Sequence, residues 1–304
     1  MMRALTTRRH FLLTKLVAGC CLLHRPAWGG PVAQVIYPRH LGPADSRYDY
    51  DWLVLRTALE KSTPAFGSFE MRQSPEQMSP QRVMQELGLA NGRINVCARA
   101  TAASLERDFL PVRIPIDKGL LGFRVFLVRA DDLPRFAAVR TVQDLRSLRA
   151  GQGKGWVDIP ILAAAGIPVV EGTHHEHLFS MLAAGRFDFF SRGVDEAWVE
   201  LKERHAQFPQ MVIEPTLLLH YPLPRYLFVR RDAEGELLAR RLQAGLETMV
   251  RDGTLSALFR QHKGPLIERA GLSRRRVLTL PNSGMTPETP LNRSELWYNP
   301  VAGK

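Results

Sequence analysis

Short apolar stretches that fit β-strands alternate with amphipathic stretches that fit α-helices, and this alternation constrains the possible folds more than any other feature. The stretches predicted as strands are residues 33–37, 66–72, 94–98, 123–129, 167–170, 187–190 and 226–230. The stretches predicted as helices are residues 48–61, 79–87, 156–165, 178–184, 194–204 and 238–249. Strands and helices of this length in alternation predict an α/β fold with a largely parallel sheet.

The first 29 residues have the layout of an export signal. Arg3, Arg8 and Arg9 form a basic start, and residues 16–23 form an apolar run too short to span a membrane. Small residues follow and end at Gly29, after which we expect cleavage. The sequence therefore predicts a protein exported to the periplasm.

The type of signal has three alternatives. Residues 7–13 resemble the twin-arginine signal, because two adjacent arginines are followed by one further residue and then Phe-Leu. A general secretory signal that happens to contain two arginines is the second. A lipoprotein signal is the third, since residues 17–20 resemble a cleavage box that would leave Cys20 lipidated.

The charge of the mature chain argues against a nucleic-acid partner. The formal net charge is +11, and loss of residues 1–29 removes five Arg and Lys and no acid, which leaves +6. The basic run at residues 274–276 has few aromatic residues interleaved with it. This is a poor pattern for nucleic-acid binding, so we expect no nucleic acid.

Reactive groups with familiar catalytic spacing do not occur. Cys97 is the one cysteine outside the predicted signal, so no disulfide can form within the mature chain, and its apolar neighbours predict a buried thiol. His174, His175 and His177 crowd one loop with Glu176, but adjacent histidines seldom point the same way. We therefore expect no enzyme activity, no metal site and no cofactor.

Three short motifs occur in the order and spacing of a known family. Residues 92–96 look like its Gly-x-hydrophobic-Asp-hydrophobic strand, with Asn95 at the aspartate position, and residues 105–107 with Pro115 resemble its Thr-x-Glu-Arg element. Residues 182–188 resemble its Leu-x-x-Gly-Arg-Val-Asp element. Over residues 33–265 the chain resembles the type 2 periplasmic solute-binding proteins, specifically the extracellular solute-binding protein family 3, best known for amino-acid uptake.

The likeness is closer to an uncharacterised branch of that family. The branch carries a Gly-Leu-Leu-Gly-x-Arg crossover, a Gly-Gln-Gly-x-Gly-Trp-x-Asp turn and a proline-rich tail that ends near Leu-Trp. This chain has the corresponding residues at 119–124, 151–158 and 289–297.

The resemblance implies a two-lobed periplasmic-binding-protein-like α/β fold of type 2, with a hinge between the lobes. Lobe one would comprise residues 30–124 and 222–277, and lobe two residues 125–221. Residues 278–304 are rich in Pro, Asn, Ser and Thr, which predicts a tail laid over the surface. The ligand would be captured as the lobes close.

The implied function is that of a monomeric extracytoplasmic solute-binding protein. It would capture a small polar solute, anionic or amino-acid-like, for an ABC permease or a sensor. Two alternatives remain open. One is a periplasmic partner module without a working cleft, and the other is a dehydratase-like enzyme on the same fold that uses a carboxylate such as Glu196.

Arginines are the main candidates for ligand binding. In the wider family, the arginine that matches Arg107 forks onto a ligand carboxylate, although Arg107 could instead form a surface pair with Glu106 or Asp108. Arg192 follows a predicted strand of lobe two. Convergence of these residues, with Arg124, would favour an anionic ligand.

The glycine-rich turn and the start of the next helix supply the other candidates. Gly153 and Lys154 precede the predicted helix, whose free amides could hold an anion, and Trp156 could stack on a ligand or belong to the core. Asp158 ends the same motif. The family usually has an aspartate near position 193, where this chain has Gly193, with Asp195 and Glu196 soon after.

Overall fold

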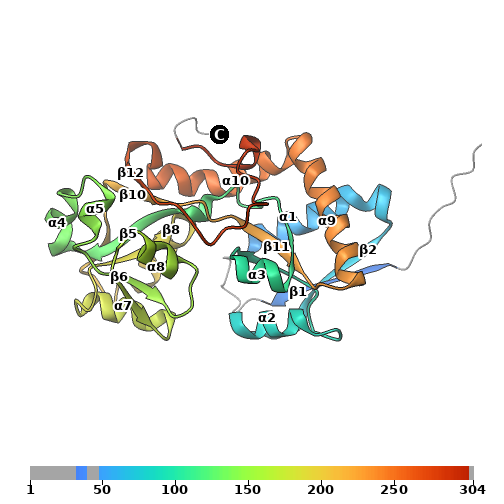
Figure 1. Cartoon of the computed structure of the whole chain (residues 1–304), viewed down its shortest axis with the longest axis horizontal. Helices are drawn as coiled ribbons and strands as arrows, with labels where there is room; N and C mark the ends of the chain where they lie inside the picture. Colours follow the sequence, from blue (N-terminus) through green and yellow to red (C-terminus); the bar gives the residue numbers. More distant parts are fainter. Residues whose placement is uncertain (1–31, 40–47, 301–304) are drawn as a thin grey trace, which may run out of the picture. The chain divides into compact units, whose positions relative to one another are not determined.

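The computed structural model describes residues 32–39 and 48–300 (Figure 1). The predicted export signal, with its twin-arginine and Cys20 alternatives, lies outside the described residues. Within them, the helices are either too short or too polar for one to cross a membrane.

Two small sheets share a core with two long helices. Strand β1 (Ala33–Arg39) pairs in parallel with β2 (Phe69–Gln77), and β11 (Arg225–Val229) lies between β3 (Val96–Ala100) and β4 (Leu110–Val112). The neighbouring helices are α1 (Asp49–Phe66), α2 (Pro80–Gly88), α3 (Ala103–Asp108) and α9 (Ala233–Arg251). Leu55 and Leu59 of α1 and Leu242 and Leu246 of α9 are fully buried in one hydrophobic cluster, so these two helices pack on each other.

A seven-stranded sheet forms the second group of elements. Its order is β12 (Arg276–Thr279), β10 (Leu217–His220), β5 (Phe123–Arg129), β8 (Phe189–Gly193), β6 (Ala150–Gly153) and β7 (Val169–Gly172), and β9 (Met211–Ile213) also pairs with β5. The helices in this part of the sequence are α4 (Leu133–Ala137), α5 (Val142–Leu145), α6 (Asp158–Ala164), α7 (His175–Ala183) and α8 (Val194–Arg204). Phe126, Phe136 and Phe189 form an aromatic core for this sheet.

The prediction of a largely parallel sheet is wrong. Strand β5 pairs antiparallel with β8, β9 and β10, and β11 pairs antiparallel with β3 and β4. The parallel pairs are β1 with β2, β6 with β7 and β8, and β10 with β12. Periodicity reports which residues face the core but not strand direction, so this error follows from the method.

Several predicted elements are confirmed with their bounds. Strand β5 and helix α8 span the predicted residues, and α2 begins where expected because the Ser79 side chain accepts a hydrogen bond from the Arg82 amide. Helix α10 (Thr254–Ala270) is not among the helices predicted from the sequence. Gly264 and Pro265 interrupt its pattern, and Lys263 occupies one of its buried positions.

The C-terminal segment is more ordered than a surface tail. Its first residues belong to β12, whose backbone pairs with β10. Near its end the segment forms the short 3-10 helix η4 (Ser294–Leu296). The other short 3-10 helices described are η1 (Leu120–Gly122), η2 (Ala130–Asp132) and η3 (Leu272–Arg274). Leu296 is fully buried in the same cluster as α1 and α9, so hydrophobic packing fixes the end of the segment.

The prediction for Cys97 is confirmed. Its side chain is buried on β3, and burial raises the pKa of its thiol to about 12. The thiol is therefore neutral and packs as a small apolar group.

Candidate ligand-binding site

Strands β6 and β8 are parallel neighbours, and the predicted site residues of this sheet follow their carboxyl ends. Gln152 on β6 donates from Nε2 to Ser191 Oγ on β8 at 3.0 Å, which locks the two ends together. In α/β proteins, ligands bind beyond the carboxyl ends of such strands. The residues placed here are Trp156, Asp158, Arg192 and Glu196.

Two glycines of strand β6 make room for aromatic rings. A Cβ on Gly151 would lie 2.2 Å from the Phe187 ring, and one on Gly153 would lie 2.3 Å from the Trp156 ring. Lys154 is exposed, and its backbone N–H donates to the carbonyl of Gly172. The two glycines therefore have a packing role, and anion binding by the amides of residues 151–155 stays a prediction.

Arg192 is buried and fully engaged with carboxylates. Its Nε and Nη2 donate to the two oxygens of Glu200 at 2.7 Å each, and Nη2 lies 3.1 Å from Glu196 Oε2. The guanidinium also lies 4.9 Å from the ring centroids of both Trp156 and Phe190. Burial alone would lower the pKa of Arg192, but Glu196 and Glu200 more than offset it and raise the pKa, so the charge is permanent.

Arg124 forms a second buried cation beside the first. Its Nη2 donates to Asp158 Oδ1 at 2.6 Å and its Nε to the Tyr221 hydroxyl at 3.2 Å, while Tyr221 donates to the same Asp158 oxygen. Arg124 Nη1 reaches Glu196 Oε2 at 3.5 Å. Glu196 Oε2 therefore bridges the two arginines.

Arg124, Asp158, Arg192, Glu196 and Glu200 form one charged network, with Trp156 beside it. Little of this network is accessible to solvent. The side chain of Glu196 is 21% exposed, and Trp156 is half-buried, whereas Arg124, Asp158 and Arg192 are buried. A ligand that enters the network would therefore meet Glu196 and Trp156 first. Two arginines here face three carboxylates, those of Asp158, Glu196 and Glu200, so the cluster has no excess positive charge.

Sequence reasoning missed three members of this network. Glu200 lies four residues after Glu196, on the face of α8 that meets Arg192, and this spacing on a helix could have indicated it. His175 lies 3.1 Å from the other side of Glu200, through Nε2. Tyr221 comes from the proline-rich turn after β10 and carries no local signal of its role.

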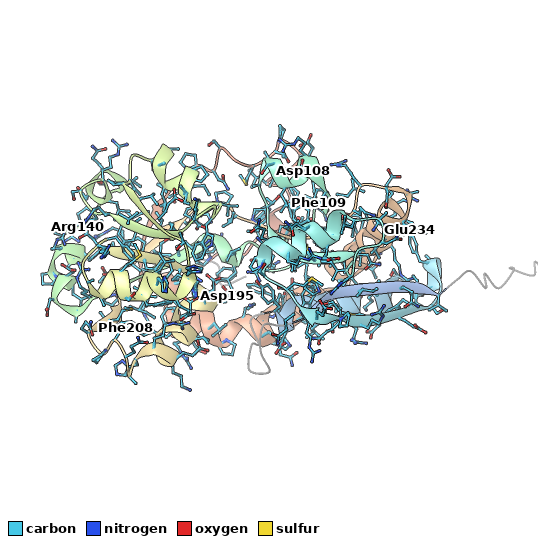
Figure 2. The ribbon with its side chains drawn as sticks, turned by 90° about the horizontal axis from the view of Figure 1, so that it is seen from below. Asp108, Phe109, Arg140, Asp195, Phe208 and Glu234 are labelled. Atoms are coloured by element: carbon cyan, nitrogen blue, oxygen red, sulfur yellow. The ribbon has the colours of Figure 1, made fainter. Side chains whose placement is uncertain are left out.

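Arg107 is not part of this network. Its side chain is 73% exposed at the end of α3 and pairs with its neighbour Asp108, with Nε 2.9 Å from Oδ1. Figure 2 labels Asp108 beside Phe109 at this end of the helix. The surface pair that the sequence allowed as an alternative is thus present, and ligand contact by Arg107 stays a prediction.

Asp195 faces a different charged cluster. Its Oδ2 accepts from Lys263 Nζ on α10 at 2.9 Å, and both side chains are 7% exposed. Nearby, Arg225 donates to Asp51 at 2.9 Å. Burial alone would raise the pKa of Asp195, but the charges of Lys263 and Arg225 more than offset it and hold the pKa below its usual range. Asp195 therefore ties α8 to α10.

The three histidines at positions 174, 175 and 177 do not converge on one point but make separate contacts. His174 and His177 pack edge to face with ring centroids 5.1 Å apart, while His175 turns toward Glu200. Among residues 32–39 and 48–300, no group of three or more His, Cys, Asp or Glu is arranged to hold a metal ion.

Comparison of the whole chain with family models gives no match, and comparison with curated proteins gives none. Solved structures do match. An ancestral arginine-binding protein bound to arginine has a TM-score of 0.50 and 18% identity, over 76% of this chain and 97% of its own. The Bordetella pertussis BvgS VFT2 domain has a TM-score of 0.52 and 17% identity, over 76% of this chain and 93% of its own.

A third structure concerns glutathione import in Streptococcus mutans via GshT and the cystine ABC importer TcyBC. It has a TM-score of 0.52 and 12% identity, over 77% of this chain and 95% of its own. At sequence identities this low, the similarity to these structures shows a shared fold alone. The chain has the two-lobed fold of the type 2 periplasmic binding proteins.

Proposed function

We propose that the protein is an extracytoplasmic solute-binding protein that captures a small, amino-acid-like solute without chemical change. The lobes would be residues 30–124 with 222–277, and residues 125–221, which close on the solute. It would act as a periplasmic monomer and present the solute to an ABC permease or a sensor. The observation that carries the proposal is the network of Arg192, Glu196 and Trp156 on a fold that the arginine-binding and importer-related structures share.

The charge balance of the network favours an amino-acid-like solute over a simple anion. A free anion would have to compete with Glu196 and Glu200, which already compensate Arg192. A solute with both charges can place its carboxylate at Arg192 and its ammonium at Glu196. The face of Trp156 would cover its apolar part.

A thermal-shift screen of the protein against amino acids, dicarboxylates, polyamines and phosphate tests this proposal. A solute at 100 times its dissociation constant adds about 2.7 kcal/mol to the free energy of unfolding. We expect a hit among the amino acids that Trp156→Ala and Glu196→Gln abolish. Lys202→Ala removes an exposed charge from the same helix and serves as the matched control.

Two results would contradict the proposal. One is a panel without any stabilising solute, which would favour the partner-module alternative. The other is a hit that survives both site variants. Arg107→Ala in the same screen tests whether the sequence-predicted clamp contributes to affinity.

A further inference from the structure

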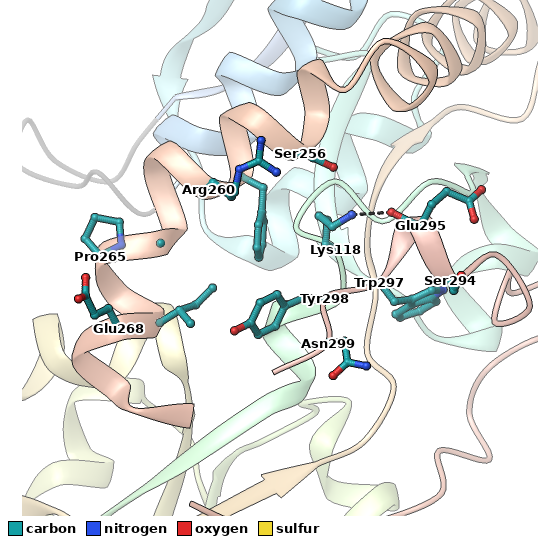
Figure 3. Close-up of a pocket in the computed structure, with 13 residues that line it drawn as sticks. Lys118, Ser256, Arg260, Pro265, Glu268, Ser294, Glu295, Trp297, Tyr298 and Asn299 are labelled. Atoms are coloured by element: carbon teal, nitrogen blue, oxygen red, sulfur yellow. Dashed lines mark hydrogen bonds between the residues drawn. The ribbon is translucent and has the colours of Figure 1, made fainter. Parts of the chain in front are cut away.

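A cavity of about 770 Å³ lies between helix α10 and the C-terminal segment (Figure 3). Its lining comes from α10, from residues 294–299 and from Lys118. This volume is typical of small-molecule sites. The residues that line it are separate from the network around Arg192, so it is a distinct candidate site.

One wall of the cavity consists of aromatic rings held in fixed positions. The rings of Phe259 and Tyr298 lie 5.6 Å apart, and Trp297 donates from Nε1 to the carbonyl of Pro290 at 2.9 Å. The turn before η1 is shaped to admit the indole, because a Cβ on Gly119 would lie 2.6 Å from the Trp297 ring. The wall is therefore rigid and apolar before any ligand arrives.

Two cations also belong to the lining. Lys118 is buried, has a left-handed backbone with φ of 51°, and donates from Nζ to the Glu295 carbonyl. Burial lowers the pKa of Lys118, the charge of Glu295 offsets part of this effect, and the charge of Arg260 lowers the pKa further. Within the part of the chain that the structure describes, Arg260 forms no ion pair.

Of the acidic residues of the lining, Glu295 offsets part of the charge of Lys118, because each of the two groups favours the charged form of the other. The Glu295 carboxylate also pairs with Arg293, whose Nε lies 2.9 Å from Oε1, and Arg293 does not belong to the lining. Glu268 lies eight residues along α10 from Arg260, which is about 12 Å along the helix axis. The lining thus combines aromatic rings with Lys118 and with Arg260, the cation that has no ion pair among the described residues.

We propose that this cavity binds an organic carboxylate with a flat apolar body. The carboxylate would lie between Lys118 and Arg260 and accept charge-assisted hydrogen bonds from both. The body would lie against Phe259, Trp297 and Tyr298.

Calorimetric titration with 1-naphthaleneacetate, and with its neutral analogue 1-naphthaleneacetamide, tests the proposal on the full chain. We expect the carboxylate to bind with a submillimolar dissociation constant and the amide to bind at least about tenfold more weakly, as loss of a charged hydrogen bond requires. No binding of the carboxylate at millimolar concentration, or equal affinity for both compounds, would overturn the proposal.

Two variants place the compound in the cavity. Gly264 lines the cavity, and a Cβ at this helical position meets no atom within 4 Å, so we expect the side chain of Gly264→Leu to extend into the space and abolish binding. Arg260→Ala should weaken binding of the carboxylate about tenfold. Arg240→Ala removes an exposed arginine from α9, outside the cavity, and should leave the affinity unchanged.

Trp156→Ala separates this cavity from the proposed solute site. We expect the Trp156 variant to bind 1-naphthaleneacetate as the unmodified protein does. If binding survives Gly264→Leu but is lost in Trp156→Ala, the compound occupies the other site and the inference is wrong.

Discussion

The carboxylate of Glu106 on α3 accepts a hydrogen bond from the hydroxyl of Thr286 at 2.9 Å, 180 residues later in the chain. The same buried carboxylate also accepts from Thr101 at 2.6 Å and from Arg113 at 2.8 Å. Beside it, the Ala103 amide donates to the carbonyl of Gly284. The C-terminal segment is thereby attached to the element that carries Arg107, the predicted ligand clamp.

Glu106→Ala should lower the free energy of unfolding by about 2–4 kcal/mol, because it leaves Arg113 and two hydroxyl donors without their acceptor. Urea unfolding followed by circular dichroism measures this loss. Glu234→Ala, which removes an exposed carboxylate from α9, should change stability by less than about 0.5 kcal/mol. Equal stability of the two variants would show that the buried network does not hold the segment.

Gly119→Ala should destabilise the protein more than the same change at Gly253. Both glycines have left-handed backbones, with φ of 71° and 79°, so both substitutions carry a backbone penalty of about 1 kcal/mol. A Cβ at Gly119 also meets the Trp297 ring, whereas a Cβ at Gly253 meets nothing within 4 Å. We expect an additional loss of about 1–3 kcal/mol at Gly119 in thermal unfolding.

The steric origin of that difference can be isolated with Trp297→Ala. In this background the Gly119→Ala substitution should cost about as much as Gly253→Ala, because the ring is gone. A Gly119 penalty that persists without the indole would contradict the steric explanation.

The sequence predicts elements well where one rule decides them. The short apolar run places β5, and the capping serine and proline place the start of α2. Helix α10 lacks such a rule, because Gly264 and Pro265 are helix breakers and its inward face includes Lys263. Its formation depends on tertiary partners such as Asp195 on α8.

The candidate site is predictable only in part, for a similar reason. Arg192 and Trp156 stand in recognisable places beside a strand end and a glycine turn. Their partners Glu200 and Tyr221 come from other elements, and only the folded chain brings them together. Arg107 shows the opposite case, since a motif suggests a clamp and the local neighbour Asp108 pairs with the side chain.

Lys263→Met should destabilise the protein at neutral pH by about 3–5 kcal/mol, because it leaves the buried Asp195 carboxylate without its cation. The pKa of Asp195 is now below its usual range, so its contribution to stability is present above about pH 4 and is lost as pH falls. Without the lysine, the pKa of Asp195 should rise, and protonation in acid should relieve part of the penalty. Urea unfolding at pH 7 and pH 4.5 should therefore show a smaller difference at the lower pH.

The matched double variant Lys263→Met with Asp195→Asn tests whether the unpaired carboxylate causes this loss. It removes both charges and should be more stable at pH 7 than Lys263→Met alone. If the double variant is the less stable of the two, the Asp195 carboxylate still stabilises the fold without Lys263, through other charges such as that of Arg225.

His220 should make the stability of the protein fall as pH drops from 6.5 to 4. Its ring stacks on Phe123 with centroids 4.3 Å apart, and burial lowers the pKa of the imidazole to about 4. Because the unfolded chain takes up this proton near pH 6.5, the stabilisation is complete above that pH and is lost as the pH approaches 4, by about 1–3 kcal/mol.

His220→Phe keeps an aromatic ring on Phe123 but cannot bind a proton, so it should flatten this part of the pH profile in urea unfolding. His205→Gln, at an exposed position after α8, should leave the profile unchanged. A profile that His220→Phe does not alter would mean that other groups govern acid unfolding in this range.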